Sequence, residues 1–221
     1  MFSKGGRDPK SSQRRPPLAR EEKMAPGWLR IIAGEHRSRR IYYNGDHSIR
    51  PMKDRTRESV FNLLGGHLQE YFAIDLFGGT GVMAMEAISR GASGAIILEM
   101  ARSAVSMILE NITNLKLADR IQVHNVDTLR WLKHVSTSSA DWPKDKWVVF
   151  CCPPYRMWMG EGQRLCSGLR ELYELSPQGS QFVVESDDQF DVQGALPEFS
   201  WDVREYKPAR IAICVKPATA S

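Results

Sequence analysis

The sequence of 221 residues contains no run of 18 apolar residues, about the length that a membrane-spanning helix requires. Its first 17 residues are basic but contain no apolar core segment, so they do not have the composition of a secretory signal. These two absences lead us to expect a cytoplasmic protein with no membrane partner. Nothing in the composition indicates an oligomer, and we expect a monomer.

The sequence also lacks the cysteine and histidine spacings of structural sites. Of its four cysteines, Cys151 and Cys152 are adjacent, Cys166 and Cys214 stand alone, and no C-x-x-C pair occurs. This pattern predicts neither a disulfide framework nor a zinc site. The five histidines lack metal-ligand spacing as well, so we expect no metal cofactor.

Acidic residues are scarce in the first part of the chain. Residues 1–60 contain 15 Lys and Arg against 7 Asp and Glu, whereas residues 61–221 contain 15 against 19. The chain thus has a basic first part, residues 1–60, and an acidic body, residues 61–221. This distribution of charge predicts a polyanionic partner, with nucleic acid as the main candidate. Residues 1–26 are rich in Lys, Arg, Pro, Ser and Gly, and we expect them to form a disordered basic tail. A solvated tail without any partner is the alternative interpretation.

From residue 72 onward, short apolar runs that predict strands alternate with segments that predict helices. The predicted strands are 72–77, 95–100, 121–127, 147–152 and 181–186, and the predicted helices lie near 81–90, 103–115, 128–134 and 162–175. Parallel strands need crossover connections, so this alternation predicts an α/β fold with a doubly wound, mostly parallel sheet. Two final apolar runs, 201–206 and 210–216, predict a C-terminal antiparallel hairpin.

A small basic N-terminal extension is predicted over residues 28–65, between the tail and this sheet. Residues 28–34 and 37–43 have strand-like patterns, and residues 54–64 predict a helix. We assign residues 27–221 to one domain and expect the extension to face nucleic acid. The basic residues expected to make that contact are Arg37, Arg39, Arg40, Arg50, Lys53, Arg55 and Arg57. Pairing of some of these arginines with acids of the body is the alternative.

A glycine-rich turn follows the first of the alternating strands. Residues 75–77 (DLF) end the strand, and residues 78–81 (GGTG) open a helix, where glycines let a ligand approach the backbone closely. A G-x-G-x-x-A match begins at Gly79, and Glu99 follows 20 residues later, so a dinucleotide such as NAD is one candidate ligand. The carboxylate of Asp75 would repel a pyrophosphate but attract a sulfonium or amino group. This charge favours S-adenosylmethionine without excluding NAD.

Acidic residues also end the next two strands. Glu99 can accept hydrogen bonds from both ribose hydroxyls of either ligand, and Asp127 can accept one from an adenine amino group. The alternative role for Asp127 is the N-cap of the helix that begins at Thr128. Met100 would pack either on the adenine face or on the core.

Two successive prolines follow the fourth strand, in the segment CCPPY over residues 151–155. Prolines cannot continue a strand ladder, so Pro153 and Pro154 fix a stiff turn whose carbonyls can point into the cleft. Tyr155 offers an aromatic face on which a flipped base could stack. In isolation, the motif could equally be a proline-rich strand exit with no binding role.

These motifs together resemble those of the RsmD family of bacterial 16S rRNA guanine-N2 methyltransferases, over a region from about Trp28 to Lys216. The resemblance is carried by RIIAGEHRSRR, by IRPMKDRTRESVFNLL, by DLFGGTGVMAMEAISRGA with the later LEM, and by PPY. It implies the class I S-adenosylmethionine-dependent methyltransferase fold with a seven-stranded sheet. It also implies a guanine of small-subunit rRNA, free or in a ribosome assembly particle, as the substrate.

The resemblance further implies two groups of site residues. The expected cofactor-binding residues are Asp75, Phe77, Gly78, Gly79, Thr80, Gly81, Glu99, Met100, Asp127 and Thr128. The expected target-binding and catalytic residues are Cys152, Pro153, Pro154 and Tyr155. The implied reaction is direct displacement: the base amine attacks the methyl group, and the site supplies proximity and orientation.

The chain departs from the family at Cys152, where the family has an acidic residue before the prolines. A carboxylate there accepts a hydrogen bond from the exocyclic amine, whereas a thiol is a weak acceptor. We still expect an active enzyme, because the carbonyls of Cys152 and Pro153 remain available as acceptors. The alternatives are a covalent role for Cys152, adenine-N6 methylation of DNA or RNA, and an RNA-binding protein that has lost catalysis.

Overall fold

The computed structural model describes residues 25–46, 49–135 and 142–218. The expectation of a disordered tail over residues 1–26 falls almost entirely outside these described residues. No helix within them is long and apolar enough to cross a membrane.

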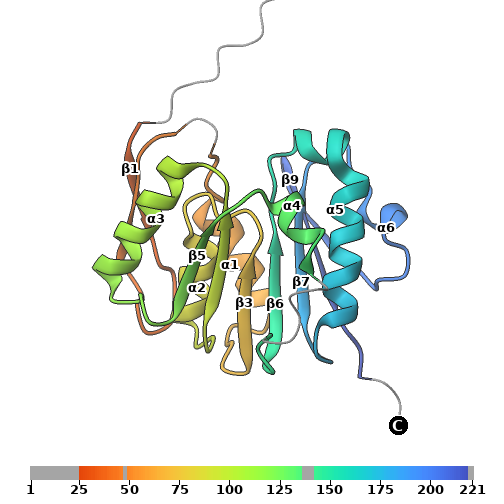
Figure 1. The fold of residues 1–221 in the computed structure, drawn as a ribbon, viewed down its shortest axis with the longest axis horizontal. Helices are drawn as coiled ribbons and strands as arrows, with labels where there is room; N and C mark the ends of the chain where they lie inside the picture. Colours follow the sequence, from red (N-terminus) through yellow and green to blue (C-terminus); the bar gives the residue numbers. More distant parts are fainter. Residues whose placement is uncertain (1–24, 47–48, 136–141, 219–221) are drawn as a thin grey trace, which may run out of the picture.

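A seven-stranded sheet forms the centre of the described chain, in the order β5-β4-β3-β6-β7-β9-β8 (Figure 1). Its strands are β3 (Tyr71–Asp75), β4 (Ala95–Glu99), β5 (Ile121–Asn125), β6 (Lys146–Cys151), β7 (Gln181–Ser186), β8 (Asp202–Tyr206) and β9 (Ala209–Val215). The strands from β5 to β7 pair in parallel, and β9 and β8 continue the sheet as an antiparallel hairpin. The predicted doubly wound sheet and its C-terminal hairpin are confirmed.

Helices cover both faces of this sheet (Figure 1). One face packs against α1 (Asp54–Leu63), α2 (Val82–Ser89) and α3 (Arg102–Leu115), and the other against α4 (Thr128–Leu132), α5 (Arg156–Leu175) and α6 (Val192–Ala195). Because side chains alternate along a strand, β6 supplies both cores: Val148 and Phe150 face the first, and Trp147 and Val149 face the second. The apolar run of this strand therefore reflects burial on both sides.

Two helical features differ from the sequence prediction. Helix α5 begins at Arg156, six residues before the predicted start, and α6 was not predicted. Gly160 and Gly162 lower the helix propensity of the first turns of α5, which obscured them in the sequence. Burial of Trp158, which stacks on Phe190 with ring centroids 4.2 Å apart, holds these turns in place.

The N-terminal extension forms a separate two-stranded antiparallel sheet of β1 (Gly27–Arg30) and β2 (Arg40–Tyr43). Hydrogen bonds from helices α2 and α3 hold its backbone in place. The carboxylate of Glu86 on α2 accepts the N–H groups of Ile32 and Ala33, at 2.7 and 3.1 Å. The amide of Asn111 on α3 bonds both the N–H and the carbonyl of Tyr42, at 2.8 and 2.9 Å. The extension is thus an integral layer of the fold.

Strand order reverses direction at β3. From β3 the chain proceeds to β4 and β5 on one side, and then returns to β6 on the other. In open α/β sheets, ligands bind outside the carboxyl ends of the strands at such a switch point. The glycine loop after β3 and the proline loop after β6 both leave the sheet here.

Candidate active site

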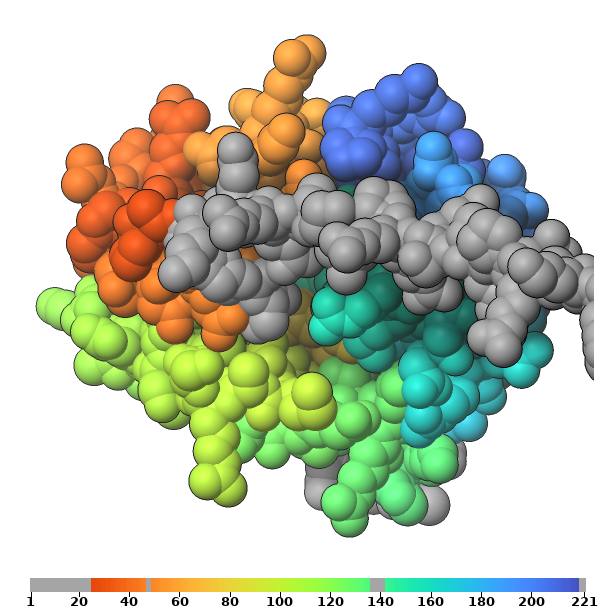
Figure 2. All heavy atoms as spheres, turned by 90° about the horizontal axis from the view of Figure 1, so that it is seen from above, coloured from red at the N-terminus to blue at the C-terminus, as the bar shows by residue number. Residues whose placement is uncertain are grey.

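A pocket of about 510 Å³ lies at this switch point, a size suited to a small-molecule ligand. Figure 2 shows this edge of the molecule, around which the N-terminal extension (orange), the C-terminal hairpin (blue) and the helices α3 to α5 (yellow-green to cyan) are arranged. The pocket lining is drawn from segments far apart in the sequence: 49–53 with Thr56, 77–80 with 82–83, 98–101, 127–129, 152–157, Glu185 and 206–209.

The glycine loop forms one wall of the pocket. A Cβ on Gly78 would lie 2.3 Å from the side chain of Ile97, so only glycine fits against β4. Gly79 has a φ of +54°, and its N–H donates to the Glu99 carboxylate at 2.7 Å. The other oxygen of Glu99 accepts the N–H of Ala101, also at 2.7 Å. Glu99 therefore fixes the loop and still faces the pocket, where each oxygen retains acceptor capacity.

The remaining predicted cofactor residues mostly line the same wall. Phe77, Thr80 and Met100 line the pocket, and Met100 is 67% exposed. Asp127 lines the pocket and also accepts the N–H of Arg130 at 2.9 Å, so it is the N-cap of α4. The helix-cap interpretation of Asp127 is therefore confirmed. Because its side chain also lines the pocket, Asp127 can still accept a hydrogen bond from a ligand.

Two predicted cofactor residues do not line the pocket. Gly81 is the N-cap of α2, with a φ of +74°, and faces the core at Met85 and Ile108. Asp75 is 1% exposed, behind the glycine loop; its Oδ2 has no hydrogen-bond partner within the described part of the chain, and the backbone N–H groups of Phe77 and Ala84 favour its charged form. Burial, together with the charge of Glu99, raises the pKa of Asp75 to about 7. Asp75 thus supports the glycine loop from behind. Its buried position does not allow a direct contact with a ligand sulfonium.

Thr128 is also buried at this edge, although it reaches the pocket lining. Its hydroxyl donates to the carbonyl of Leu76, at the exit of β3. This bond joins the loop after β5 to the loop after β3. The carboxyl ends of β3 and β5 are therefore connected by a hydrogen bond at the pocket wall.

The proline loop forms the opposite wall. Cys152, Pro153, Pro154 and Tyr155 all line the pocket, so the structure brings the predicted target-binding residues together with the glycine loop. Burial, followed by the negative charge of Glu185, raises the pKa of the Cys152 thiol well above its usual value. A protonated thiol is a poor nucleophile, so this raised pKa disfavours a covalent role for Cys152.

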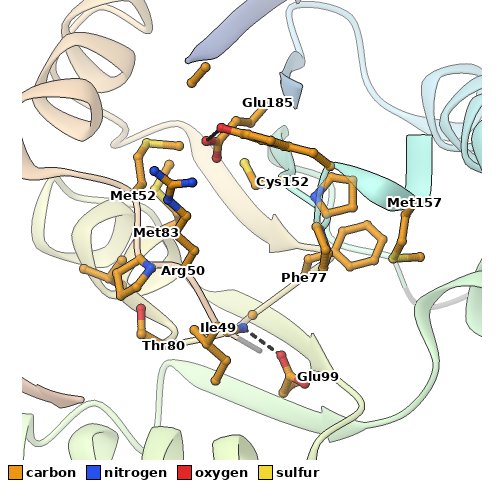
Figure 3. Close-up of a pocket in the computed structure, with 18 of the residues that line it drawn as sticks. Ile49, Arg50, Met52, Phe77, Thr80, Met83, Glu99, Cys152, Met157 and Glu185 are labelled. Carbon is orange, nitrogen blue, oxygen red and sulfur yellow. Dashed lines mark hydrogen bonds between the residues drawn. The ribbon is translucent and has the colours of Figure 1, made fainter. Parts of the chain in front are cut away.

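Sequence reasoning missed Glu185, an acid at the carboxyl end of β7. Its side chain lines the pocket, and the hydroxyl of Tyr155 donates to it at 2.9 Å. Figure 3 shows Glu185 beside Cys152 at one end of the pocket and Glu99 at the other. The rule that ligands bind at the carboxyl ends of parallel strands could have identified Glu185, since β7 is the neighbour of β6.

Other missed lining residues come from outside the parallel sheet. Ile49 and Met52 precede α1, and Lys207 and Pro208 form the turn of the C-terminal hairpin. Ile49 and Met52 belong to the segment IRPMKDRTRESVFNLL, which carries part of the family resemblance, but only the tertiary fold shows that either segment reaches the pocket.

The structure separates the predicted basic residues into two places. Arg50 and Lys53 are exposed and line the pocket, and Arg55 is exposed on α1. Arg37, Arg39 and Arg40 are exposed as well, but the connection between β1 and β2 lies beside the C-terminal ends of α2 and α3. There Glu35 N–H donates to the Ser89 carbonyl, and the Arg39 guanidinium donates to the Asn114 carbonyl. Since α2 begins at the pocket, this second group lies a helix length away from it.

The prediction that Arg57 contacts nucleic acid is wrong. Its side chain is completely buried, and its guanidinium donates to the carbonyls of Met52 and Arg30 and to the carboxylate of Asp54. Arg57 precedes the buried residues Val60 and Phe61 by one helical turn, so it lies on the inner face of α1. Its guanidinium also lies 3.9 Å from the carboxylate of Glu86, so pairing with an acid of the body was the correct alternative for this arginine.

Comparison with known proteins extends these observations. Residues 29–208 match the family model described as Conserved hypothetical protein 95. "Ribosomal RNA small subunit methyltransferase D" of Escherichia coli strain K12 is 34% identical over 130 residues, which are 59% of this chain and 62% of that protein. The protein of the same name from Haemophilus influenzae is 31% identical over 138 residues, 62% of this chain and 69% of that protein.

Solved structures share the fold. The Escherichia coli protein yhhF is 26% identical, with a TM-score of 0.69 over 87% of this chain and all of that one. An RNA methyltransferase from Salinibacter ruber, in complex with S-adenosyl-L-homocysteine, has a TM-score of 0.52 at 16% identity, over 78% of this chain and 97% of that one. The predicted S-adenosylmethionine-dependent methyltransferase fold is thereby confirmed. The family match over residues 29–208 shows that this chain belongs to the RsmD family.

Proposed function

We propose that this protein transfers a methyl group from S-adenosylmethionine to the exocyclic N2 amine of a guanine in small-subunit rRNA. One observation carries the proposal: a single continuous pocket is lined both by the glycine loop with Glu99 and by the proline loop from Cys152 to Tyr155. A methyl donor at the first wall and a base at the second would therefore meet inside one cavity. The names of the relatives support rRNA as the substrate class.

The chemistry of the first wall suits S-adenosylmethionine better than a dinucleotide. When bound, this group supplies an electrophilic methyl carbon on a sulfonium. The wall presents the carboxylates of Glu99 and Asp127, which can accept hydrogen bonds from ribose hydroxyls and an adenine amine. Asp75 adds a further acidic group directly behind the loop. Carboxylates at a glycine loop disfavour the pyrophosphate that NAD would place there.

The second wall suits a planar base whose amine points into the pocket. Tyr155 can stack on the base, and the stiff turn at Pro153 and Pro154 presents backbone carbonyls that can accept the amine hydrogens. Arg50 and Lys53, at the rim of the same pocket, can contact the phosphates that flank an extruded nucleotide. These residues position and orient the amine, and the reaction needs no covalent link to the protein.

Methyl transfer from labelled S-adenosylmethionine tests the proposal. We expect label in small-subunit rRNA or in its assembly particle, and N2-methylguanosine in a nucleoside digest examined by mass spectrometry. Label in N6-methyladenosine would replace the guanine assignment with adenine. Binding of RNA without transfer to any rRNA particle or DNA would make the chain an RNA-binding protein.

Calorimetry separates the cofactor assignment from the substrate assignment. S-adenosylhomocysteine should bind with a stoichiometry of one, and NAD should produce no heat of binding. Glu99→Gln removes one charge from the wall while retaining its size, and should weaken S-adenosylhomocysteine binding. Binding of NAD alone would overturn the cofactor assignment.

A further inference from the structure

The second wall of the pocket contains one acid among the described residues, and it lies beside Cys152. Three carboxylates line the pocket, and two of them, Glu99 and Asp127, belong to the first wall. The third is Glu185. Strands β6 and β7 are parallel and pair Cys151 with Val184, so Cys152 and Glu185 lie side by side at the carboxyl edge of the sheet (Figure 3).

The position of this carboxylate is fixed from two sides. The Tyr155 hydroxyl donates to Oε1 of Glu185 at 2.9 Å, and the neighbouring Cys152 thiol favours the charged form of the carboxylate. The indole N–H of Trp158, which is buried, donates to the backbone carbonyl of Glu185 at 2.9 Å. A carboxylate offers about four lone-pair sites, so the Tyr155 hydroxyl leaves acceptor capacity for a ligand in the pocket that Glu185 lines.

We propose that Glu185 is the acceptor for the target amine, and that it supplies from β7 the carboxylate that is absent at Cys152. This inference rests on the proposed function. A hydrogen bond from the amine to Glu185 orients the nitrogen lone pair toward the methyl carbon. Tyr155 then has two roles, since it stacks on the base and holds the carboxylate that receives the amine hydrogen.

The step balances with this residue as the proton acceptor. The nitrogen lone pair forms the new N–C bond, and the electron pair of the breaking S–C bond passes to sulfur, which changes from sulfonium to thioether. The nitrogen, now positive, releases a proton to the Glu185 carboxylate. The resulting carboxylic acid returns that proton to solvent, and the carboxylate is regenerated.

The charges around Glu185 are compatible with this role. Burial raises the pKa of Glu185, and the hydroxyl of Tyr155, the charge of Arg50 and the thiol of Cys152 oppose that rise. A raised pKa makes the carboxylate a better proton acceptor. The group must be ionised to act, so kcat should fall on the acid side as Glu185 becomes protonated. Substitution by glutamine should remove that acid limb.

A rescue experiment tests the proposal, with methyl transfer to rRNA as the assay. Glu185→Gln should lower kcat by roughly 10²- to 10³-fold, in the range of a lost general base, with the affinity for S-adenosylhomocysteine changed less than twofold. Cys152→Asp in the Glu185→Gln background should restore much of the loss, because it returns a carboxylate to the neighbouring strand end. In the wild-type background the same Cys152→Asp change should have a smaller effect. Asp188→Asn, an exposed acid shortly after β7, is the matched control and should retain the wild-type rate.

The outcomes separate this proposal from the proposed function. If the wild type transfers no methyl group to any rRNA, the proposed function fails first. If the wild type is active and Glu185→Gln keeps both its rate and its acid limb, Glu185 is not the acceptor. A third outcome is that the Glu185→Gln variant transfers methyl groups slowly, shows by its thermal unfolding that it is folded, and is not rescued by Cys152→Asp. Glu185 then acts only in holding the proline loop, and the proposal is overturned.

Discussion

The guanidinium of Arg57 lies 3.9 Å from the carboxylate of Glu86, and both side chains are completely buried. Glu86 also accepts the N–H groups of Ile32 and Ala33 and pairs with Arg90 at 2.8 Å. This ionic cluster joins the connection between β1 and β2, α1 and α2. The Arg57 guanidinium of this cluster also donates to the carbonyl of Met52, between Arg50 and Lys53. The position of the segment that carries these two residues therefore depends on buried interactions.

Removal of one partner from this cluster should destabilise the fold. Arg57→Met leaves the buried Glu86 carboxylate with one cation fewer, and we expect a loss of about 3–5 kcal/mol in the free energy of unfolding. Denaturant titration followed by circular dichroism measures this loss. Arg55→Met, two residues away on the exposed side of α1, is the matched control and should stay within about 0.5 kcal/mol of the wild type. Equal stability of the two variants would contradict the role of the cluster.

Asp75→Asn should change the dependence of stability on pH. Below about pH 4 this carboxyl is protonated in both the folded and unfolded chains. As pH rises from about 4 to about 7, the unfolded chain releases the proton and the folded chain keeps it, so the wild type loses stability. The penalty is complete above about pH 7, on the order of 4 kcal/mol at 1.36 kcal/mol per pKa unit.

The asparagine variant cannot ionise, so its stability relative to the wild type should increase across that pH range. Urea unfolding of both proteins without ligand, at several pH values from 4 to about 8, measures the difference. A difference that does not change with pH would show that Asp75 titrates normally. Calorimetry on the same variant tests whether the loop keeps its affinity for S-adenosylhomocysteine.

Two pairs of exposed basic residues should differ in their effects on RNA. Arg50→Ala with Lys53→Ala removes charges at the pocket, and Arg37→Ala with Arg39→Ala removes charges near the C-terminal ends of α2 and α3. Each lost phosphate contact should reduce the log–log salt slope by about 0.7–0.9. We expect both pairs to flatten the slope, and the pocket pair to lower kcat more. An unchanged slope for either pair would remove that pair from the RNA interface.

Cys152→Ser should retain methyl transfer. The raised pKa of Cys152 keeps its thiol protonated, and the backbone carbonyls of the proline loop do not depend on this side chain. Single-turnover transfer from labelled S-adenosylmethionine measures the rate, and intact-protein mass spectrometry detects any covalent adduct with RNA. An inactive serine variant together with an adduct on the wild type would establish a covalent mechanism in place of direct displacement.

Most of the sheet could be predicted because its signals are local. Apolar runs such as residues 147–151 alternate with helical segments, and this alternation determines parallel pairing through the need for crossovers. The glycine loop and the proline loop were each placed at a strand end, and the strand order then brings both to one pocket. The pairing of these loops follows from topology, and no local spacing in the sequence reveals it.

The predictions that failed concern residues whose environment is set by distant parts of the chain. Arg57 has the local pattern of a surface arginine, but inside the fold it pairs with Asp54 and also lies 3.9 Å from the buried Glu86, which is 29 positions later. Asp75 ends its strand like a ligand-binding acid, yet the loop closes over it and buries it. Glu185 was overlooked because its role depends on which strand lies beside β6.

The two hydrogen bonds that Glu99 makes to Gly79 and Ala101 bear on how fast a ligand can bind. They order the glycine loop as part of folding, so a ligand meets a wall that already has its final shape. Association then needs no slow rearrangement of this wall, and little of the binding free energy is lost to ordering it.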